Sequence, residues 1–383
     1  MKNILINKFK DIFKRNDGQS YFSPARVNLI GEHIDYNGGF VFPCALSIGT
    51  YGIIAPRNDD TAQVCTNIFD TGIYRFSIKK LIKDPNNDWT DYIKGVLAAL
   101  EKRNFNVSHG FDLYIHGNMP HGAGLSSSAS LESLIVTMLD DMFKFDIALE
   151  QKALIGQDAE NNFVGVNSGI MDQFAIIAGK KDHAILLNTE NLSFRYTPLN
   201  LNDYRLLIVN TNKKRGLSDS KYNERFTETR EALGVLKPIY LIENLCELKP
   251  NILPSIENIL SNILYKRVHH VVTEQQRTLD AAKALINNDL ETFGLLMNQS
   301  HESLKNDYDV TGLELDTLQA LLLSHGAIGA RMTGAGFGGS CIAVVHKDKV
   351  EQLRVNVQNS YTNIIGYSPT FIEATISDGT SKI

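Results

Sequence analysis

The sequence predicts a mixed α+β protein with two lobes, and three observations lead to this prediction. The chain has 383 residues, a length that favours two domains or one large two-lobed enzyme. Hydrophobic residues make up 43% and charged residues 21%, as in globular proteins, which excludes a disordered or fibrous chain. Strand-like segments prevail early, whereas the chain beyond about residue 215 is mostly helical in pattern. We therefore expect an N-terminal lobe over residues 1–205 and a C-terminal lobe over residues 206–383.

The individual elements follow from the periodicity of the apolar residues. The first 17 residues predict a short amphipathic helix and not a secretory signal, because Lys8 and Lys10 interrupt the apolar residues. Strand-forming stretches are expected over residues 21–56, 110–119, 183–188, 204–212 and 341–345. Helical spacing is expected over residues 89–103, 131–143, 151–163, 273–286 and 313–326.

Charge and cysteine content exclude several classes of function. The formal net charge is −5 and no long basic run occurs, which argues against a nucleic-acid surface. No apolar run approaches the roughly 18 residues of a membrane span. The four cysteines are widely scattered and form no CxxC pair, so we expect reduced thiols in a cytoplasmic protein: Cys44, Cys65, Cys246 and Cys341.

The segment ARVNLIGEHIDYNGG, residues 25–39, ends a strand-like run with ionisable side chains. An apolar stretch leads into Gly31 and is followed by Glu32, His33 and Asp35. Ionisable side chains at the end of a strand do not stabilise a hydrophobic core. Two carboxylates, an imidazole and a nearby arginine are the donors and acceptors that a ligand with many hydroxyl groups requires. The alternative is a surface ion-pair cluster.

A second segment, GAGLSSS, opens directly onto a predicted helix. Small residues let the backbone approach a ligand closely, and the start of a helix presents unpaired N–H groups, so the loop is suited to phosphate. An ordinary serine N-cap is the alternative, although three serines are more than a cap needs. The loop lacks the lysine of a Walker A motif. Its residues are Gly122, Ala123, Gly124, Leu125, Ser126, Ser127 and Ser128.

A third segment, residues 334–339, formally matches GxGxxG but stands in the wrong context for dinucleotide binding. That motif requires a helix after the glycines, whereas residues 341–345 predict a strand. We expect these glycines to let one backbone pass close to another, or to the rim of the phosphate site.

Together the three segments resemble the motifs of the small-molecule kinase superfamily of galactokinase, homoserine kinase, mevalonate kinase and phosphomevalonate kinase. Within it, ARVNLIGEHIDYNGG resembles the N-terminal signature special to galactokinases. The segments GVNSGIMDQFAIIAGK, SDSKYNERF, RVHHVVTEQQR, DVTGLELDTL and GARMTGAGFGG are also similar to galactokinase segments, over about residues 20–345. The resemblance implies a two-lobed α+β kinase fold with the active site in the cleft between the lobes.

The resemblance implies which residues would bind a hexose. Glu32, His33 and Asp35 would bind its hydroxyl groups, and Gly169 would approach the sugar through its backbone. Tyr222 would hydrogen-bond a further hydroxyl, although a tyrosine in a polar stretch is often a surface residue.

The resemblance also implies the residues that act in phosphoryl transfer. Asp172 would face the anomeric hydroxyl, either as a general base or only to orient it, because phosphoryl-transfer transition states demand little base assistance. Arg26 would hold Asp172 ionised and offset charge on the transferred group. A helix-capping role for Asp172 fits poorly inside an apolar run.

The implied co-substrate is ATP with Mg²⁺. By resemblance the magnesium ligands are Ser128 and Glu160, although Glu160 taken alone would be assigned to a solvated helix face. The loop over residues 122–128 would bind the phosphates, and Thr66 and Trp89 would lie near the adenine side.

These residues lead to the hypothesis of a galactokinase that acts on α-D-galactose, with two alternatives. A kinase for galactosamine or N-acetylgalactosamine would share nearly all the motifs. A non-catalytic galactose and ATP sensor typically has a shortened serine loop, whereas Ser128, Ala129 and Ser130 are present here. We expect a monomer. Several positions depart from the galactokinase pattern and bear on substrate preference and loop geometry: Ala25, Ile34, Asn161, Asn188 and Phe226.

Overall fold

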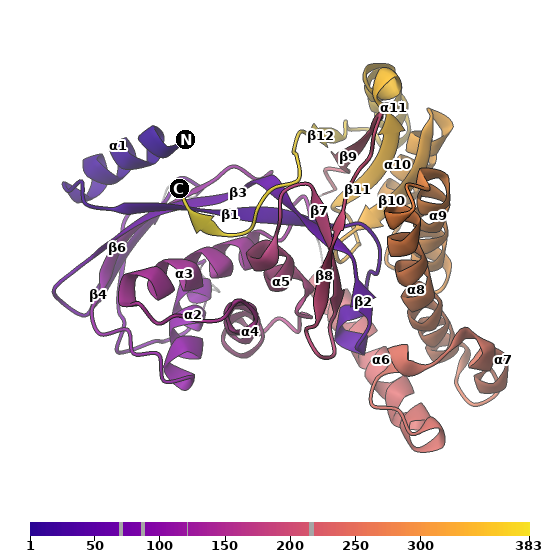
Figure 1. Ribbon diagram of the computed structural model, residues 1–383, viewed down its shortest axis with the longest axis horizontal. Helices are drawn as coiled ribbons and strands as arrows, with labels where there is room; N and C mark the ends of the chain where they lie inside the picture. The colour runs from indigo at the N-terminus through magenta and orange to yellow at the C-terminus, as the bar shows by residue number, and fades with distance from the viewer. Residues whose placement is uncertain (69–71, 86–88, 121, 214–217) are drawn as a thin grey trace.

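Over its described residues the chain folds into an N-terminal and a C-terminal lobe around three sheets, as the computed structural model shows (Figure 1). The structure describes residues 1–68, 72–85, 89–120, 122–213 and 218–383. A six-stranded sheet in the order β13-β1-β3-β6-β4-β5 forms the N-terminal lobe. Its strands are β1 (Gln19–Asn28), β3 (Pro43–Pro56), β4 (Thr61–Thr66), β5 (Tyr74–Ser77), β6 (Phe111–Gly117) and β13 (Ser381–Lys382).

Helices cover both faces of this sheet, and the alternation of side chains along β3 explains how. Ile53 packs with the residues of the first helix, whereas the next residue, Ile54, packs with the helices of the opposite face. The predicted N-terminal helix is confirmed and buries Leu5 and Phe9. The helices of this lobe are α1 (Lys2–Phe13), α2 (Thr90–Lys102), α3 (Ser127–Phe143), α4 (Leu149–Asp158) and α5 (Met171–Ala178).

The C-terminal lobe contains a four-stranded sheet in the order β10-β11-β9-β12, packed against helices. The long helices α8 and α9 run side by side along it in Figure 1. The strands are β9 (Tyr204–Asn210), β10 (Ala327–Thr333), β11 (Ser340–His346) and β12 (Thr370–Ile372). The helices are α6 (Ser218–Tyr240), α7 (Leu253–Ile256), α8 (Asn262–Ile286), α9 (Leu290–Asn306), α10 (Leu313–Ser324) and α11 (Val350–Ile365).

A small sheet and the end of β1 both connect the lobes. A small sheet of β2 (Phe40–Val41), β7 (His183–Asn188) and β8 (Phe194–Pro198) lies between them in Figure 1. The end of β1 stays paired with β3 up to Asn28, yet Val27 and the following Leu29 are buried in one core with Phe293 and Ile342 of the C-terminal lobe. This strand therefore carries its last residues to the junction of the lobes.

The division at residues 205 and 206 stays a prediction. β9 starts at Tyr204, close to that point, but β13 returns to the N-terminal sheet, where it pairs with Tyr21 and Phe22 of β1. Within the described part of the chain, no helix is both long and apolar enough to cross a membrane.

Candidate active site

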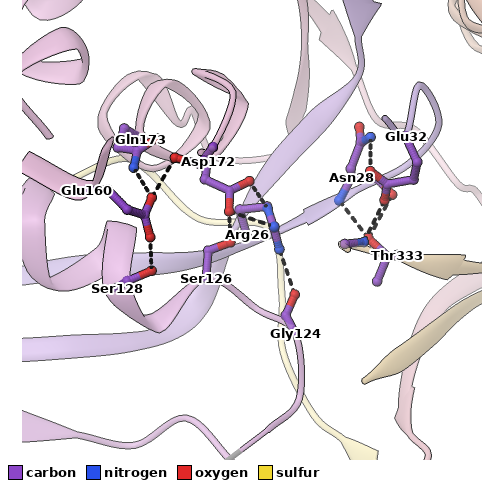
Figure 2. Close-up of polar contacts among 12 residues, drawn as sticks. Arg26, Asn28, Glu32, Gly124, Ser126, Ser128, Glu160, Asp172, Gln173 and Thr333 are labelled. Carbon is purple, nitrogen blue, oxygen red and sulfur yellow. Dashed lines mark hydrogen bonds and ion pairs between the residues drawn. The ribbon is translucent and has the colours of Figure 1, made fainter. Parts of the chain in front are cut away.

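The turn after β1 places Glu32 at the meeting point of the lobes. Gly31 adopts a φ of +98°, and a Cβ there would lie 2.8 Å from the carbonyl oxygen of Phe40, so only glycine fits. Glu32 is 1% exposed. Its Oε2 accepts from Nδ2 of Asn28 at 2.9 Å (Figure 2). Its Oε1 accepts from the backbone N–H of Gly334 at 2.7 Å. Both oxygens thus have protein partners, which fix the direction of the carboxylate.

His33 is held by the protein through both ring nitrogens. Its Nε2 lies 3.2 Å from the carbonyl oxygen of Ala335, and its Nδ1 lies 2.9 Å from the hydroxyl of Tyr36. Because a carbonyl only accepts, Nε2 carries the proton and Nδ1 accepts from Tyr36. Burial, together with the nearby His270, lowers the pKa of His33 to about 3, so the ring is neutral. The role of His33 as a direct sugar ligand stays a prediction.

Asp35 and Gly169 are brought into contact. A Cβ on Gly169 would lie 1.8 Å from Oδ2 of Asp35, so the carboxylate lies directly on the glycine backbone. Burial and the charges of Asp172 and Glu32 raise the pKa of Asp35 to about 7. Asp35 therefore belongs to a cluster of three carboxylates and not to a surface ion-pair network.

Tyr222 of α6 lies against this cluster. Its ring centroid is 5.5 Å from that of His33 and 5.7 Å from that of Tyr36. Burial and the charges of Asp35 and Asp172 raise the pKa of its hydroxyl well above the usual value. The alternative of an exposed surface tyrosine is therefore wrong.

Arg26 and Asp172 form the central ion pair of the site (Figure 2). Nε of Arg26 donates to Oδ1 of Asp172, and Nη2 donates to Oδ2, each at 2.8 Å. The remaining nitrogen, Nη1, donates to the carbonyl oxygen of Gly124 at 2.8 Å. The side chain of Arg26 is 5% exposed and that of Asp172 is 25% exposed. This bidentate geometry fixes the carboxylate but leaves it accessible.

The glycine/serine loop opens onto α3 as predicted, and its serines make different contacts. Ser126 adopts a left-handed conformation, makes no side-chain cap bond and donates to Oδ2 of Asp172. Ser127 is exposed at the helix start. Ser128 donates to Oε1 of Glu160 at 2.8 Å. The ordinary N-cap interpretation is therefore wrong for Ser126.

Glu160 lies on a π-helical turn, Ala159–Val164, that continues α4. It is 7% exposed, so the solvated-face interpretation is wrong. Its Oε2 accepts from Oγ of Ser168 at 2.9 Å and from Nε2 of Gln173 at 2.8 Å (Figure 2). Burial and the charge of Asp172 raise its pKa, and no Lys, Arg or His among the described residues pairs with it. A buried carboxylate beside a second one, with a hydroxyl neighbour, fits a divalent cation that prefers oxygen ligands.

The third glycine segment connects β10 to β11 and packs on the glycine/serine loop. A Cβ on Gly334 would lie 3.0 Å from the carbonyl oxygen of Gly124, and Oγ of Ser340 donates to the carbonyl oxygen of Ala123 at 2.7 Å. The expected close passage of two backbones is confirmed. Because a strand follows the glycines, the dinucleotide-binding interpretation is excluded.

Thr66 and Trp89 contact other residues of the N-terminal lobe. Thr66 ends β4, which is separated from β1 by β3 and β6, and its hydroxyl accepts from the N–H of Ile68. Trp89 precedes α2 and packs edge-on against Tyr74. Their assignment to the adenine side stays a prediction.

Sequence reasoning missed several polar residues that hold the site together. Nε2 of Gln173 donates both to Glu160 and to Oε2 of the fully buried Glu132. Oγ1 of Thr333 accepts from the N–H of Asn28 at 3.0 Å and so joins the two lobes (Figure 2). Of these residues, only Gln173 could have been suspected from the sequence, because it directly follows Asp172.

Comparison with known proteins identifies the class to which this fold and site belong. Family models match the GHMP kinases N terminal domain over residues 91–180 and the GHMP kinases C terminal domain over residues 281–363. The solved mevalonate kinase of Methanococcus jannaschii shares the fold, with a TM-score of 0.67 over 95% of this chain and all of that one, at 20% identity. The chain therefore has the architecture of the GHMP kinases.

Closer relatives define the family within this class. A model of the galactokinase galactose-binding signature matches residues 7–56. Galactokinase of Clostridium acetobutylicum is 50% identical over 100% of this chain and 99% of its own length, and that of Lactiplantibacillus plantarum is 48% identical over 99% of both. Lactococcus lactis galactokinase, solved in complex with galactose, is 42% identical and superposes with a TM-score of 0.98 over both complete chains. This chain belongs to the galactokinase family.

Proposed function

We propose that this chain transfers the γ-phosphoryl group of ATP to the anomeric hydroxyl of α-D-galactose, giving α-D-galactose 1-phosphate and ADP. This reaction is the first committed step of galactose catabolism. Membership of the galactokinase family and the solved relative complexed with galactose support the proposal. The observation that carries it is the Arg26–Asp172 ion pair. It lies where the turn after β1 (residues 31–35, the sugar-signature turn) meets the glycine/serine loop.

Galactose would bind against the turn after β1. Glu32 and Asp35 offer carboxylate oxygens, Gly169 offers its backbone, and Tyr222 offers a hydroxyl. Because the bonds to Asn28 and the N–H of Gly334 fix Glu32, little side-chain ordering is needed when the sugar binds. His33 would be a further sugar ligand, with its ring oriented by Tyr36 and by the carbonyl oxygen of Ala335.

Asp172 would face the reacting hydroxyl. Its carboxylate can accept the proton of that hydroxyl as the oxygen attacks phosphorus, or it can only orient the hydroxyl for attack. Arg26 holds the carboxylate of Asp172 through two hydrogen bonds and places a positive charge beside the transferred group. The hydrogen bond from Ser126 limits the carboxylate further to one direction.

The nucleotide phosphates would lie at the start of α3. Backbone N–H groups of the loop and the helix dipole favour negative charge there. Ser128 and Glu160 would hold Mg²⁺, which when bound offsets the charge of the β- and γ-phosphates. Among the described residues no group of three or more His, Cys, Asp or Glu side chains could form a dedicated metal site, which agrees with an ion bound mainly by phosphates and water.

The proposal includes a cytoplasmic location and a monomeric state. All four cysteines lie within the described residues and all are free, as expected for reducing surroundings.

The test is an ADP-release assay with Mg-ATP and a panel of D-galactose, D-glucose, galactosamine and N-acetylgalactosamine. Asp172→Asn is expected to lower kcat for galactose by roughly 10²- to 10⁴-fold, the usual contribution of a general base or positioned carboxylate. Asp280→Asn on the outer face of α8 is the matched control and should retain wild-type kcat.

Each outcome separates the hypotheses. Turnover selective for galactose supports the proposal. Turnover with an amino sugar alone would keep the mechanism and change the substrate. Saturable galactose binding without turnover of any sugar would indicate a sensor.

A further inference from the structure

One face of α8 contacts the sugar-signature turn. His270, Glu274 and Thr278 are spaced four residues apart and therefore share a face of the helix. Nε2 of His270 lies 3.0 Å from the carbonyl oxygen of Glu32, and the N–H of Phe40 donates to Oε1 of Gln275 at 2.8 Å. His270, Glu274 and Gln275 belong to the segment RVHHVVTEQQR, to which the reaction itself assigns no role.

Glu274 makes the central contact of this face. The side chain is completely buried. Its Oε1 accepts from the N–H of Gly31 at 2.9 Å and from Oγ of Ser300 at 2.6 Å, and its Oε2 accepts from Nε of Arg277 at 2.7 Å. A carboxylate is thus placed inside the protein with three donors around it, one of which is the backbone of the turn.

Surrounding charges keep this carboxylate ionised. Burial acts to raise its pKa, but the positive charges of Arg277 and Arg331, with His270, bring the pKa of Glu274 down to about 2. Arg331 is also completely buried, and its Nη1 lies 3.5 Å from Oε1 of Glu32. The same guanidinium donates to the carbonyl oxygens of Asn28 and Leu29. The charge network therefore spans from α8 to the sugar-signature carboxylate.

The contact with Gly31 determines where Glu32 points. Gly31 is the residue directly before Glu32 and lies in the left-handed region, where the chain reverses. Glu274 accepts from the N–H of Gly31, and His270 contacts the carbonyl oxygen of Glu32. The helix α8 thereby holds the N–H of Gly31 and the carbonyl of Glu32, the two ends of the residue pair that carries the carboxylate.

We propose that Glu274 is a positioning residue for sugar binding, which acts through Gly31 on Glu32 and never touches the substrate itself. This inference rests on the proposed function, because it assumes that Glu32 binds the sugar. Glu32 would contact galactose equally in the ground state and in the transition state. Loss of its positioning therefore raises KM for galactose more than it changes kcat.

The test compares the steady-state constants of Glu274→Gln with those of the wild type. The amide keeps the shape of the side chain but weakens the bond to Gly31, and KM for galactose should rise roughly 5- to 30-fold. Both kcat and KM for ATP should stay within about twofold. Asp91→Asn is the matched control, because it breaks the buried Asp91–Lys94 ion pair of the N-terminal lobe. It should lower Tm without changing KM for galactose.

A second variant guards against misfolding, because Glu274→Gln leaves Arg277 without a buried partner. The double variant Glu274→Gln with Arg277→Gln removes both charges and should show the same rise in KM. An unchanged KM for galactose in a folded variant, equal changes in kcat and KM for ATP, or failure of both variants to fold would each overturn the inference. A wild type that does not phosphorylate galactose would instead overturn the proposed function.

Discussion

Replacement of Gly169 by alanine tests whether Asp35 recognises the sugar. The new Cβ would lie 1.8 Å from Oδ2 and 2.3 Å from Cγ of Asp35. An ordinary contact needs about 3.4 Å, so the carboxylate must move by about 1.6 Å. A displacement of that size breaks a hydrogen bond to a charged group, which contributes about 1.5–3 kcal/mol. Gly169→Ala should therefore lower kcat/KM for galactose by roughly 10- to 150-fold.

The assay is initial-rate measurement at saturating ATP over a range of galactose concentrations, with Tm recorded for each variant. KM for ATP should change by less than about twofold, because the displaced carboxylate belongs to the sugar side. Gly234→Ala is the control, since a Cβ on this residue of α6 meets no atom within 4 Å. Alanine there should leave kcat/KM unchanged and stabilise the helix by up to about 1 kcal/mol. A folded Gly169→Ala variant with wild-type kcat/KM for galactose would refute the reasoning.

Two further predictions concern the other carboxylates. Glu160→Gln should reduce the factor by which Mg²⁺ increases the affinity for ADP by roughly 10- to 100-fold, as measured by calorimetry. An unchanged factor would remove Glu160 from the metal site. Asp35→Asn should change how stability depends on pH. The pKa of Asp35 is raised to about 7, so the folded wild type keeps a proton that the unfolded chain loses at lower pH. The wild type therefore loses stability as the pH rises toward about 7, and the variant should not show this loss. The variant should exceed the wild type in unfolding free energy by about 1–3 kcal/mol at pH 8, with the difference shrinking toward pH 5, and urea titrations with a constant difference would contradict this.

Local patterns in the sequence predicted the parts of the site that depend on local structure. Small residues before an apolar helical pattern were enough to predict the loop that opens onto α3. A strand pattern after the third glycine segment was enough to exclude dinucleotide binding. Both conclusions depend on neighbours in the chain, where periodicity and backbone freedom act.

Contacts between distant segments lay beyond such reasoning. Arg26 and Asp172 are 146 residues apart, and only the resemblance to a known family suggested that they meet. The helical spacing over residues 273–286 does not indicate that Glu274 is completely buried against Gly31, 243 residues away. Glu160 lies on a π-helical turn, which a period of 3.6 residues does not describe.

The course of β1 has a consequence for recombination between relatives. Val27 and Leu29 are buried in a core with residues of the C-terminal lobe, and the turn after them is held by α8. Residues 25–42 are thus distant in sequence from the lobe on which their conformation depends. A chimera that joins an N-terminal lobe from one galactokinase to a C-terminal lobe from another should therefore inherit its sugar segment together with the C-terminal half. A crossover placed only near residue 205 would separate the two partners and leave the sugar turn on a foreign helix.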